Sequence, residues 1–136
     1  ISYEECEVRI GKDIALRVKE ISIKLYQEAS EFALTKGIII ADTKFEFGVD
    51  DKNNLVLIDE ILTPDSSRFW PLDQYCEGRA QPSFDKQYIR DWLESSGWNK
   101  SPPPPKLSEE VIEKTSKRYI EAFERITNLS LNSDEF

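Results

Sequence analysis

Charged side chains alternate along one predicted strand and offer the most concentrated chemistry in the sequence. Residues 38–47 are rich in β-branched and aromatic side chains, which predicts a β-strand. Because successive strand residues point to opposite faces, Asp42, Lys44 and Glu46 lie on the same face. Such a row of charges can contribute to a cation site. The alternative is a solvated sheet face on which Lys44 neutralises its neighbours.

A second predicted strand, residues 55–62, carries Asp59 directly after an apolar run. A four-residue loop over residues 51–54 would make the two strands a hairpin and place Glu46 opposite Asp59. Two facing carboxylates repel each other unless a cation lies between them. Mg²⁺ prefers one or two carboxylates together with substrate phosphates, so the pair is a candidate magnesium site.

The loop after this strand, residues 63–70, holds Ser66, Ser67 and Arg68. Two hydroxyls and a guanidinium can bind a phosphate or a carboxylate through charge-assisted hydrogen bonds. The simpler alternative is a turn closed by Asp or Ser side chains, with Arg68 in solvent.

Lys86 and Arg90 stand four residues apart in a predicted helix over residues 84–95. Like charges at this spacing repel unless an anion or an acidic residue lies nearby. An anionic ligand is one answer, and Glu94, four residues after Arg90, is the other.

The composition limits the chemistry further. The chain has 136 residues, no histidine and a net charge of -8, which excludes His-dependent nucleophilic and zinc mechanisms from these residues. The acidic balance argues against nucleic acid as a partner. The two cysteines, Cys6 and Cys76, have no metal-binding spacing and fit a reducing, cytoplasmic location, and no apolar run is long enough to cross a membrane.

Three blocks of sequence resemble the SAICAR (phosphoribosylaminoimidazole-succinocarboxamide) synthase family. They are IADTKFEFG at residues 40–48, DEILTPDSSRFW at residues 59–70, and SFDKQYIRDWL at residues 83–93. The resemblance covers residues 13–128 and implies the C-terminal part of that enzyme.

The resemblance implies an ATP-dependent ligase of purine biosynthesis. The family joins L-aspartate to carboxyaminoimidazole ribonucleotide (CAIR), giving SAICAR, ADP and phosphate, and requires Mg²⁺. A carboxylate is a poor electrophile, so its activation as an acyl phosphate precedes attack by the aspartate amine, while cations shield the converging charges.

The resemblance also implies roles for individual residues. Glu46 and Asp59 would ligate Mg²⁺ near the ATP phosphates, and Asp42 and Lys44 would line the reaction centre. The CAIR-binding residues would be Ser66, Ser67 and Arg68, with Arg68 at the ribose phosphate and with Lys86 and Arg90 as weaker additions. The family's glycine-rich phosphate loop and its ATP-binding lysine have no counterpart here, so a nucleotide-binding N-terminal half is the expected partner.

The elements that must position these residues predict an α+β protein. In it an antiparallel hairpin, part of a larger sheet, packs with about four helices. Helices are predicted at residues 2–9, capped by Ser2, at residues 13–36, and from Ser108 onward, with a possible helical turn at residues 72–77. Residues 1–128 form the expected domain, and residues 129–136 a frayed tail.

Two rival functions remain at this stage. One is a non-catalytic interaction domain that docks through the proline run at residues 102–105 and the acidic tail. The other is a kinase-like phosphotransferase acting on a small molecule.

Overall fold

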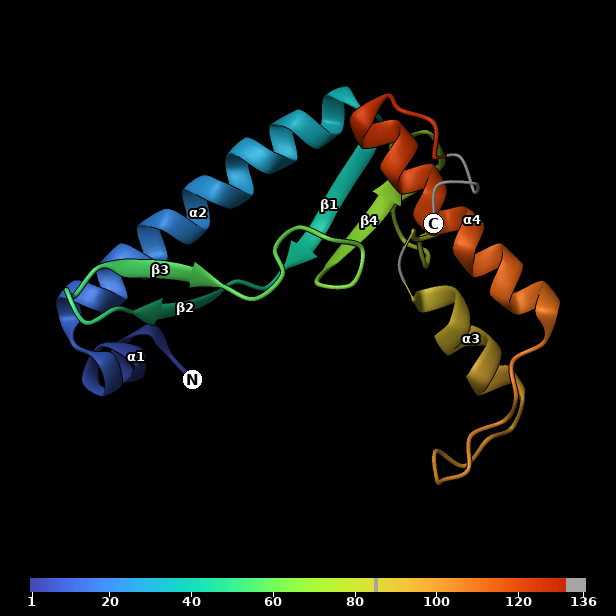
Figure 1. Cartoon of the computed structure of the whole chain (residues 1–136), viewed down its shortest axis with the longest axis horizontal. Helices are drawn as coiled ribbons and strands as arrows, with labels where there is room; N and C mark the ends of the chain where they lie inside the picture. The colour runs from blue at the N-terminus through green and yellow to red at the C-terminus, as the bar shows by residue number, and fades with distance from the viewer. Residues whose placement is uncertain (85, 132–136) are drawn as a thin grey trace.

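The computed structural model describes residues 1–84 and 86–131 and has the predicted α+β class. Its helices are α1 (Tyr3–Ile10), α2 (Lys12–Thr35), η1 (Leu72–Gln74), α3 (Gln87–Ser95) and α4 (Glu109–Thr127). Its strands are β1 (Ile38–Thr43), β2 (Glu46–Val49), β3 (Leu55–Ile58) and β4 (Ser67–Pro71). Figure 1 shows α2 running along one side of the molecule and α4 along the other, with β1 and β4 between them.

The strands form two separate antiparallel ribbons, β1–β4 and β2–β3. The single strand predicted over residues 38–47 is therefore wrong in one respect, because it divides at Lys44 and Phe45 into β1 and β2. The hairpin itself is confirmed, with Phe47 opposite Leu57. Strand β4 was not predicted, since its proline and short length favour a loop in the sequence.

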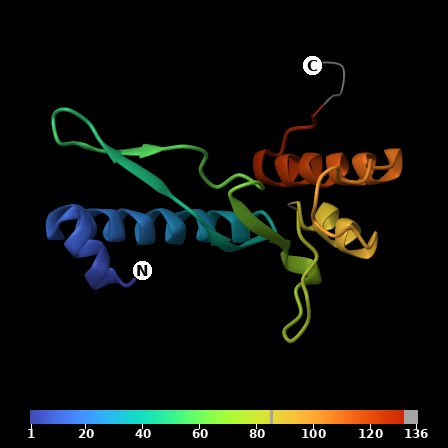
Figure 2. The same ribbon diagram turned by 90° about the horizontal axis from the view of Figure 1, so that it is seen from below.

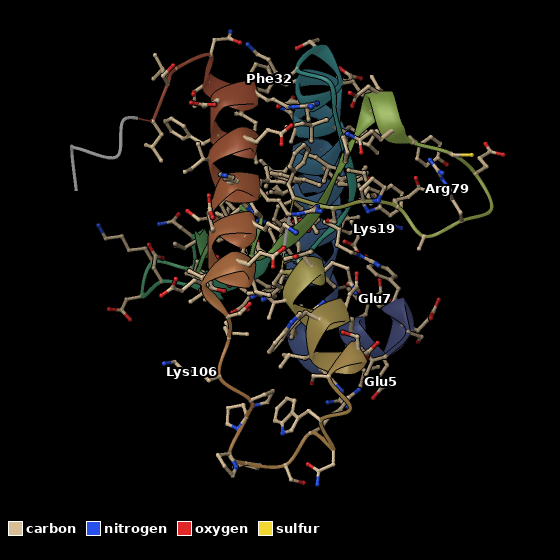
Figure 3. All side chains as sticks on the ribbon, turned by 90° about the vertical axis from the view of Figure 1, so that its right-hand side faces the viewer. Glu5, Glu7, Lys19, Phe32, Arg79 and Lys106 are labelled. Carbon is tan, nitrogen blue, oxygen red and sulfur yellow. The ribbon has the colours of Figure 1, made fainter. Side chains whose placement is uncertain are left out.

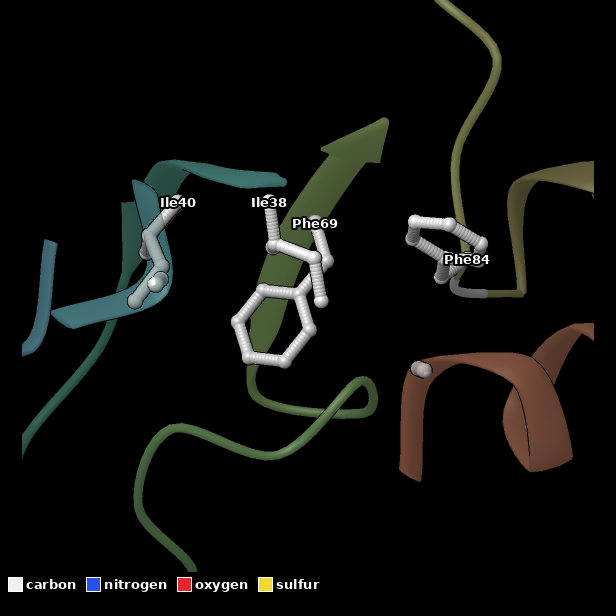
Figure 4. Packing of buried hydrophobic residues seen from close by; sticks show 6 residues of the cluster. Ile38, Ile40, Phe69 and Phe84 are labelled. Carbon is white, nitrogen blue, oxygen red and sulfur yellow. The ribbon is translucent and has the colours of Figure 1, made fainter. Parts of the chain in front are cut away.

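The core lies where β1 and β4 meet α2 and α4 (Figure 4). Ile38 and Phe69 are 0% and 2% exposed and pack with Ile40, Phe84 and Ala122. In β4 the buried residues alternate with Arg68 and Trp70, so one face of the strand enters the core and the other carries the polar chemistry.

Local signals predicted the ends of two helices. The Ser2 hydroxyl accepts a hydrogen bond from the Glu5 amide at 3.2 Å, and Ser108 caps α4 through the Val111 amide at 3.4 Å. Residues 72–74 of the expected turn form the short helix η1.

The predicted start of α3 is wrong. The helix begins at Gln87 because Phe84 enters the core and the buried Ser83 hydroxyl donates to the Phe69 carbonyl at 3.2 Å. Tertiary packing thus keeps these residues out of the helix that Ser83 was expected to cap.

The expected tail begins close to the end of α4. Asn128 follows the helix in a left-handed conformation, with φ of 57°, as a helix C-terminus prefers. Of the tail predicted over residues 129–136, residues 132–136 lie outside the described part of the chain. Among the described residues, no helix is both long and apolar enough to span a bilayer.

Candidate functional site

Lys44 lies at the centre of the candidate site. Its ammonium group donates to Glu46 Oε1 at 2.6 Å and to Asp59 Oδ2 at 2.8 Å. Lys44 occupies the link between β1 and β2, Glu46 begins β2, and Asp59 follows β3. Two carboxylates from neighbouring strands therefore converge on one cation.

The predicted pairing of Glu46 with Asp59 across the hairpin is wrong by one residue. Glu46 is opposite Ile58, and Asp59 has already left the strand with φ of 63°. This left-handed turn aims the Asp59 carboxylate at Lys44. Both acids therefore contact Lys44, although strand periodicity alone does not predict that Asp59 does so.

The electrostatics of the cluster favour its charged forms. Hydrogen bonds from Lys44 lower the pKa of Asp59, and the two carboxylates raise the pKa of Lys44, with Asp59 contributing most. Lys44 is therefore fully protonated at neutral pH. It is a cation that can steady negative charge and is unsuited to act as a general base.

Arg68 and Asp42 form the second charged unit, across the β1–β4 ribbon. Arg68 Nε lies 2.9 Å from both Asp42 oxygens, and the Nη2 group also donates to Asp42. A register shift between Ile40 and Asp42 brings Asp42 opposite Arg68. The hydrogen bonds from Arg68 lower the pKa of Asp42, so the carboxylate stays ionised and holds the guanidinium in place.

The two serines of the predicted anion loop lie in different surroundings. Ser67 is only 4% exposed, and its hydroxyl donates to Thr43 at 2.8 Å, so it ties β4 to β1. The Ser66 hydroxyl accepts from the Thr63 amide at 3.0 Å within a tight turn. Ser66 is half-buried and belongs to the loop that presents Arg68.

Lys86 reaches this same loop. Its ammonium group donates to Asp65 at 2.6 Å, and this bond is the main cause of the lowered pKa of Asp65. Lys44 contributes a smaller electrostatic effect on Asp65, which places the loop within range of the Lys44 cluster. Asp65 therefore neutralises the charge of Lys86. The sequence had suggested an anionic ligand or Glu94 for this role.

Arg90 points elsewhere. Lys86 is the N-cap residue of α3, one turn before Arg90, and its ammonium group binds Asp65 rather than a ligand shared with Arg90. Arg90 lines a separate pocket of about 340 Å³ beside Trp98, while Glu94 pairs with Lys100 at 3.5 Å. The structure therefore divides the two cations that the sequence grouped.

A larger basin of about 430 Å³ lies over the outer face of β4. Arg68 and Trp70 line it together with Tyr75 and Arg79, and the Trp70 and Tyr75 rings stack at 6.0 Å between centroids. Figure 3 shows Arg79 on the loop that projects beyond the helices. Tyr75 and Arg79 were not predicted to line this pocket, because nothing in their spacing in the sequence links them to β4.

The carboxylates of the site supply only part of the ligands that a hard divalent cation needs. Among residues 1–84 and 86–131 no group of three or more His, Cys, Asp or Glu side chains could hold a metal ion. Glu46 and Asp59 supply two carboxylates, which suits Mg²⁺ when substrate phosphates complete its shell. These two residues are the ones that would hold it.

Replacing Lys86 by Met should raise the pKa of Asp65 toward its ordinary value, because the principal hydrogen bond that lowers it is removed. The stabilisation from this pair is present at neutral pH and is lost as the pH falls through the lowered pKa of Asp65. The unfolding free energy of Lys86→Met should therefore depend less on pH in the acid range. Carboxyl-carbon NMR titration and pH-dependent unfolding measure both effects.

Lys106→Met is the matched control, since Lys106 is exposed and distant in sequence from Asp65. An Asp65 pKa that stays low in Lys86→Met would contradict the assigned cause.

The SAICAR synthetase family model matches residues 1–105 of the chain. The chain belongs to the SAICAR synthetase family. It is 62% identical over 127 residues to the phosphoribosylaminoimidazole-succinocarboxamide synthase of Actinobacillus succinogenes, covering 93% of this chain and 44% of that protein. The corresponding Pasteurella multocida protein is 63% identical, with the same coverage.

Solved SAICAR synthases have the same fold. The Saccharomyces cerevisiae enzyme complexed with SAICAR superposes with a TM-score of 0.88 at 44% identity, over 97% of this chain and 44% of that chain. A SAICAR synthetase in complex with ADP superposes at 0.68, with 29% identity, over 97% of this chain and 46% of that chain. The chain thus spans less than half the length of these relatives.

Proposed function

We propose that this chain is the C-terminal part of an ATP-dependent ligase that joins L-aspartate to CAIR, giving SAICAR, ADP and phosphate in purine biosynthesis. The observation that carries the proposal is the convergence of Glu46 and Asp59 on the Lys44 ammonium, at 2.6 and 2.8 Å. A relative whose structure contains SAICAR and another whose structure contains ADP support the assignment of the product and the nucleotide. The cysteines are free, which is compatible with the cytoplasmic location we propose.

The reaction needs positive charge where several anions meet. A carboxylate, a triphosphate and the two aspartate carboxylates must approach one another, and cations reduce their repulsion. Bound Mg²⁺ would supply this shielding at the phosphates, with Glu46 and Asp59 as its protein ligands. Lys44, held in its charged form by the same carboxylates, would steady charge that develops at the reaction centre.

The CAIR end of the site would lie on the β1–β4 ribbon. Arg68 presents a planar fork that suits a phosphate, and Asp42 fixes its orientation through two nitrogens. Ser66 shapes the turn before Arg68, and Ser67 anchors β4, so we assign both serines to supporting this geometry rather than to direct contact. Lys86 would add positive charge beside the loop, and Arg90 makes the weakest case of the predicted residues.

The nucleotide site would be completed by a nucleotide-binding N-terminal half. The glycine-rich phosphate loop and the lysine that meets the ATP phosphates have no counterpart in these 136 residues. Activity is therefore proposed for the full-length protein and not for this chain by itself.

The test is the stoichiometry of ADP release by the full-length protein with ATP, Mg²⁺ and CAIR. A ligase releases ADP in step with SAICAR, and sustained release requires L-aspartate. Sustained ADP release without aspartate, together with a phosphorylated product, would indicate the kinase-like phosphotransferase instead. No ADP release under either condition would favour the non-catalytic interaction domain, which would dock through the proline run at residues 102–105 and the acidic tail.

A further inference from the structure

Arg118 on α4 makes two contacts with the segment that leads into α3. Its Nη1 group donates to the Ser83 carbonyl at 2.5 Å, and its guanidinium lies 5.1 Å from the centre of the Tyr88 ring. Arg118 is half-buried, so both contacts are partly shielded from water. Figures 1 and 2 show α3 beside α4, at the end of the molecule away from α1. One side chain of α4 therefore holds both ends of the segment 83–88.

Lys86 lies between these two contacts. It is three residues after Ser83 and two residues before Tyr88, at the N-cap position of α3. Its side chain takes no part in capping the helix, and its ammonium group donates to Asp65 at 2.6 Å. A lysine side chain loses rotamer freedom when it is held in one geometry, and a backbone that is already fixed adds no further cost of ordering. The contact between Lys86 and Asp65 therefore depends on how firmly the segment is held.

A second set of hydrogen bonds attaches the same segment to β4. The Ser83 hydroxyl and the Phe84 amide both donate to the Phe69 carbonyl, at 3.2 and 2.9 Å. Phe69 directly follows Arg68 in β4. Ser83 is thus bound on one side by α4, through Arg118, and on the other side by the strand that carries the candidate site.

Arg118 reaches the candidate site through its neighbours. It lines a small cavity of about 190 Å³ that also includes Ser83, whereas Arg68 and Ser83 line the larger basin over β4. Asp65, which binds Lys86, belongs to the loop that presents Arg68. A continuous chain of contacts therefore runs from Arg118 through the segment 83–88 to this loop.

We propose that Arg118 is a positioning residue for the CAIR end of the site. It fixes the segment that carries Lys86, and Lys86 in turn holds Asp65 and the loop that presents Arg68. The identity of the bound molecule rests on the proposed function, but the chain of contacts can be measured without turnover.

Arg118→Met in the full-length protein removes both contacts and keeps the apolar part of the side chain. The KM for CAIR should rise by about 3- to 10-fold, with kcat within about twofold, because an indirect coupling is lost and no group leaves the reaction centre. The pKa of Asp65 should rise toward its ordinary value, since a less well-placed Lys86 donates a weaker hydrogen bond. Glu60 and Lys44 also act on Asp65, and the substitution leaves both in place. Steady-state kinetics and carboxyl-carbon NMR titration measure the two effects.

A double-mutant cycle tests whether Arg118 acts through Lys86. In a Lys86→Met background, Arg118→Met should change the KM for CAIR by less than about twofold and should not raise the pKa of Asp65 further. Effects of the two substitutions that simply multiply would contradict this route. A raised KM with an unchanged Asp65 pKa in Arg118→Met alone would contradict it as well.

Two controls separate positioning from a general loss of stability. Lys117→Met removes the neighbouring cation of α4, which pairs with Glu113 at 2.6 Å, and should change neither the KM nor the Asp65 pKa. Ala15→Gly in α2 removes a buried methyl group and introduces glycine into a helix. It should lower the melting midpoint and leave both other quantities unchanged.

Tyr88→Leu takes the place of Arg118→Met if that variant does not fold, because it removes the ring on which the guanidinium lies. The KM for CAIR and the Asp65 pKa should then change in the same directions. Unchanged values in the folded variant would overturn the proposal. If the unsubstituted protein formed no SAICAR, the proposed function would be wrong instead, and the Asp65 pKa in the single and double variants would still decide whether Arg118 positions Lys86.

Discussion

Turnover by the full-length protein should fall by about 100-fold or more when Glu46 is replaced by Gln, and likewise for Asp59→Asn. Each substitution removes one of the two carboxylates that we propose as Mg²⁺ ligands, and metal-ion stabilisation of a transition state contributes several kcal/mol. The loss should appear in kcat at saturating ATP and should be partly relieved by raising the Mg²⁺ concentration. Steady-state kinetics over a Mg²⁺ titration measures it.

Asp51→Asn is the matched control, because Asp51 is an exposed acid in the turn of the same hairpin. Its kcat should stay within twofold of the unsubstituted protein. Glu46 and Asp59 are both exposed, so circular dichroism should show an intact fold in every variant. An unchanged kcat in Glu46→Gln and Asp59→Asn would remove these residues from the mechanism.

Replacing Arg68 by Lys should raise the KM for CAIR by about 10- to 100-fold, with a smaller change in kcat. A charged hydrogen bond is worth about 1.5–3 kcal/mol, and the lysine ammonium cannot reproduce the planar fork that Asp42 now orients. The KM for ATP should change little, because the proposed phosphate contact belongs to CAIR. Varying one substrate at a time separates these constants.

Arg9→Lys provides the comparison, since Arg9 also forms an ion pair with an acid, Glu5 on α1, but far along the chain from the site. Its kinetic constants should not change. If Arg68→Lys lowered kcat and left the KM for CAIR unaltered, Arg68 would act at the reaction centre and the proposed phosphate contact would be wrong.

Features with local causes were predictable from the sequence. The caps at Ser2 and Ser108 depend on a side chain and an amide three residues apart, and both were confirmed. The long helix α2 and the hairpin turn follow from periodicity and turn residues in the same way. By contrast, the predicted start of α3 was wrong, because Phe84 is buried in a core built from segments distant in the sequence, and this burial overrides the local capping signal.

The candidate site shows the same division. The sequence by itself determined the family, the α+β class and the acids, cations and hydroxyls available, since these follow from residue type and order. Only the tertiary structure decided which of them meet: Lys44 between Glu46 and Asp59, Arg68 with Asp42, and Lys86 with Asp65. A left-handed turn at Asp59 brings its carboxylate to Lys44, and a register shift in β1 brings Asp42 opposite Arg68. The register shift lies in a pair of strands that are distant in the chain, and the period-two pattern of a strand does not predict where Asp59 leaves it.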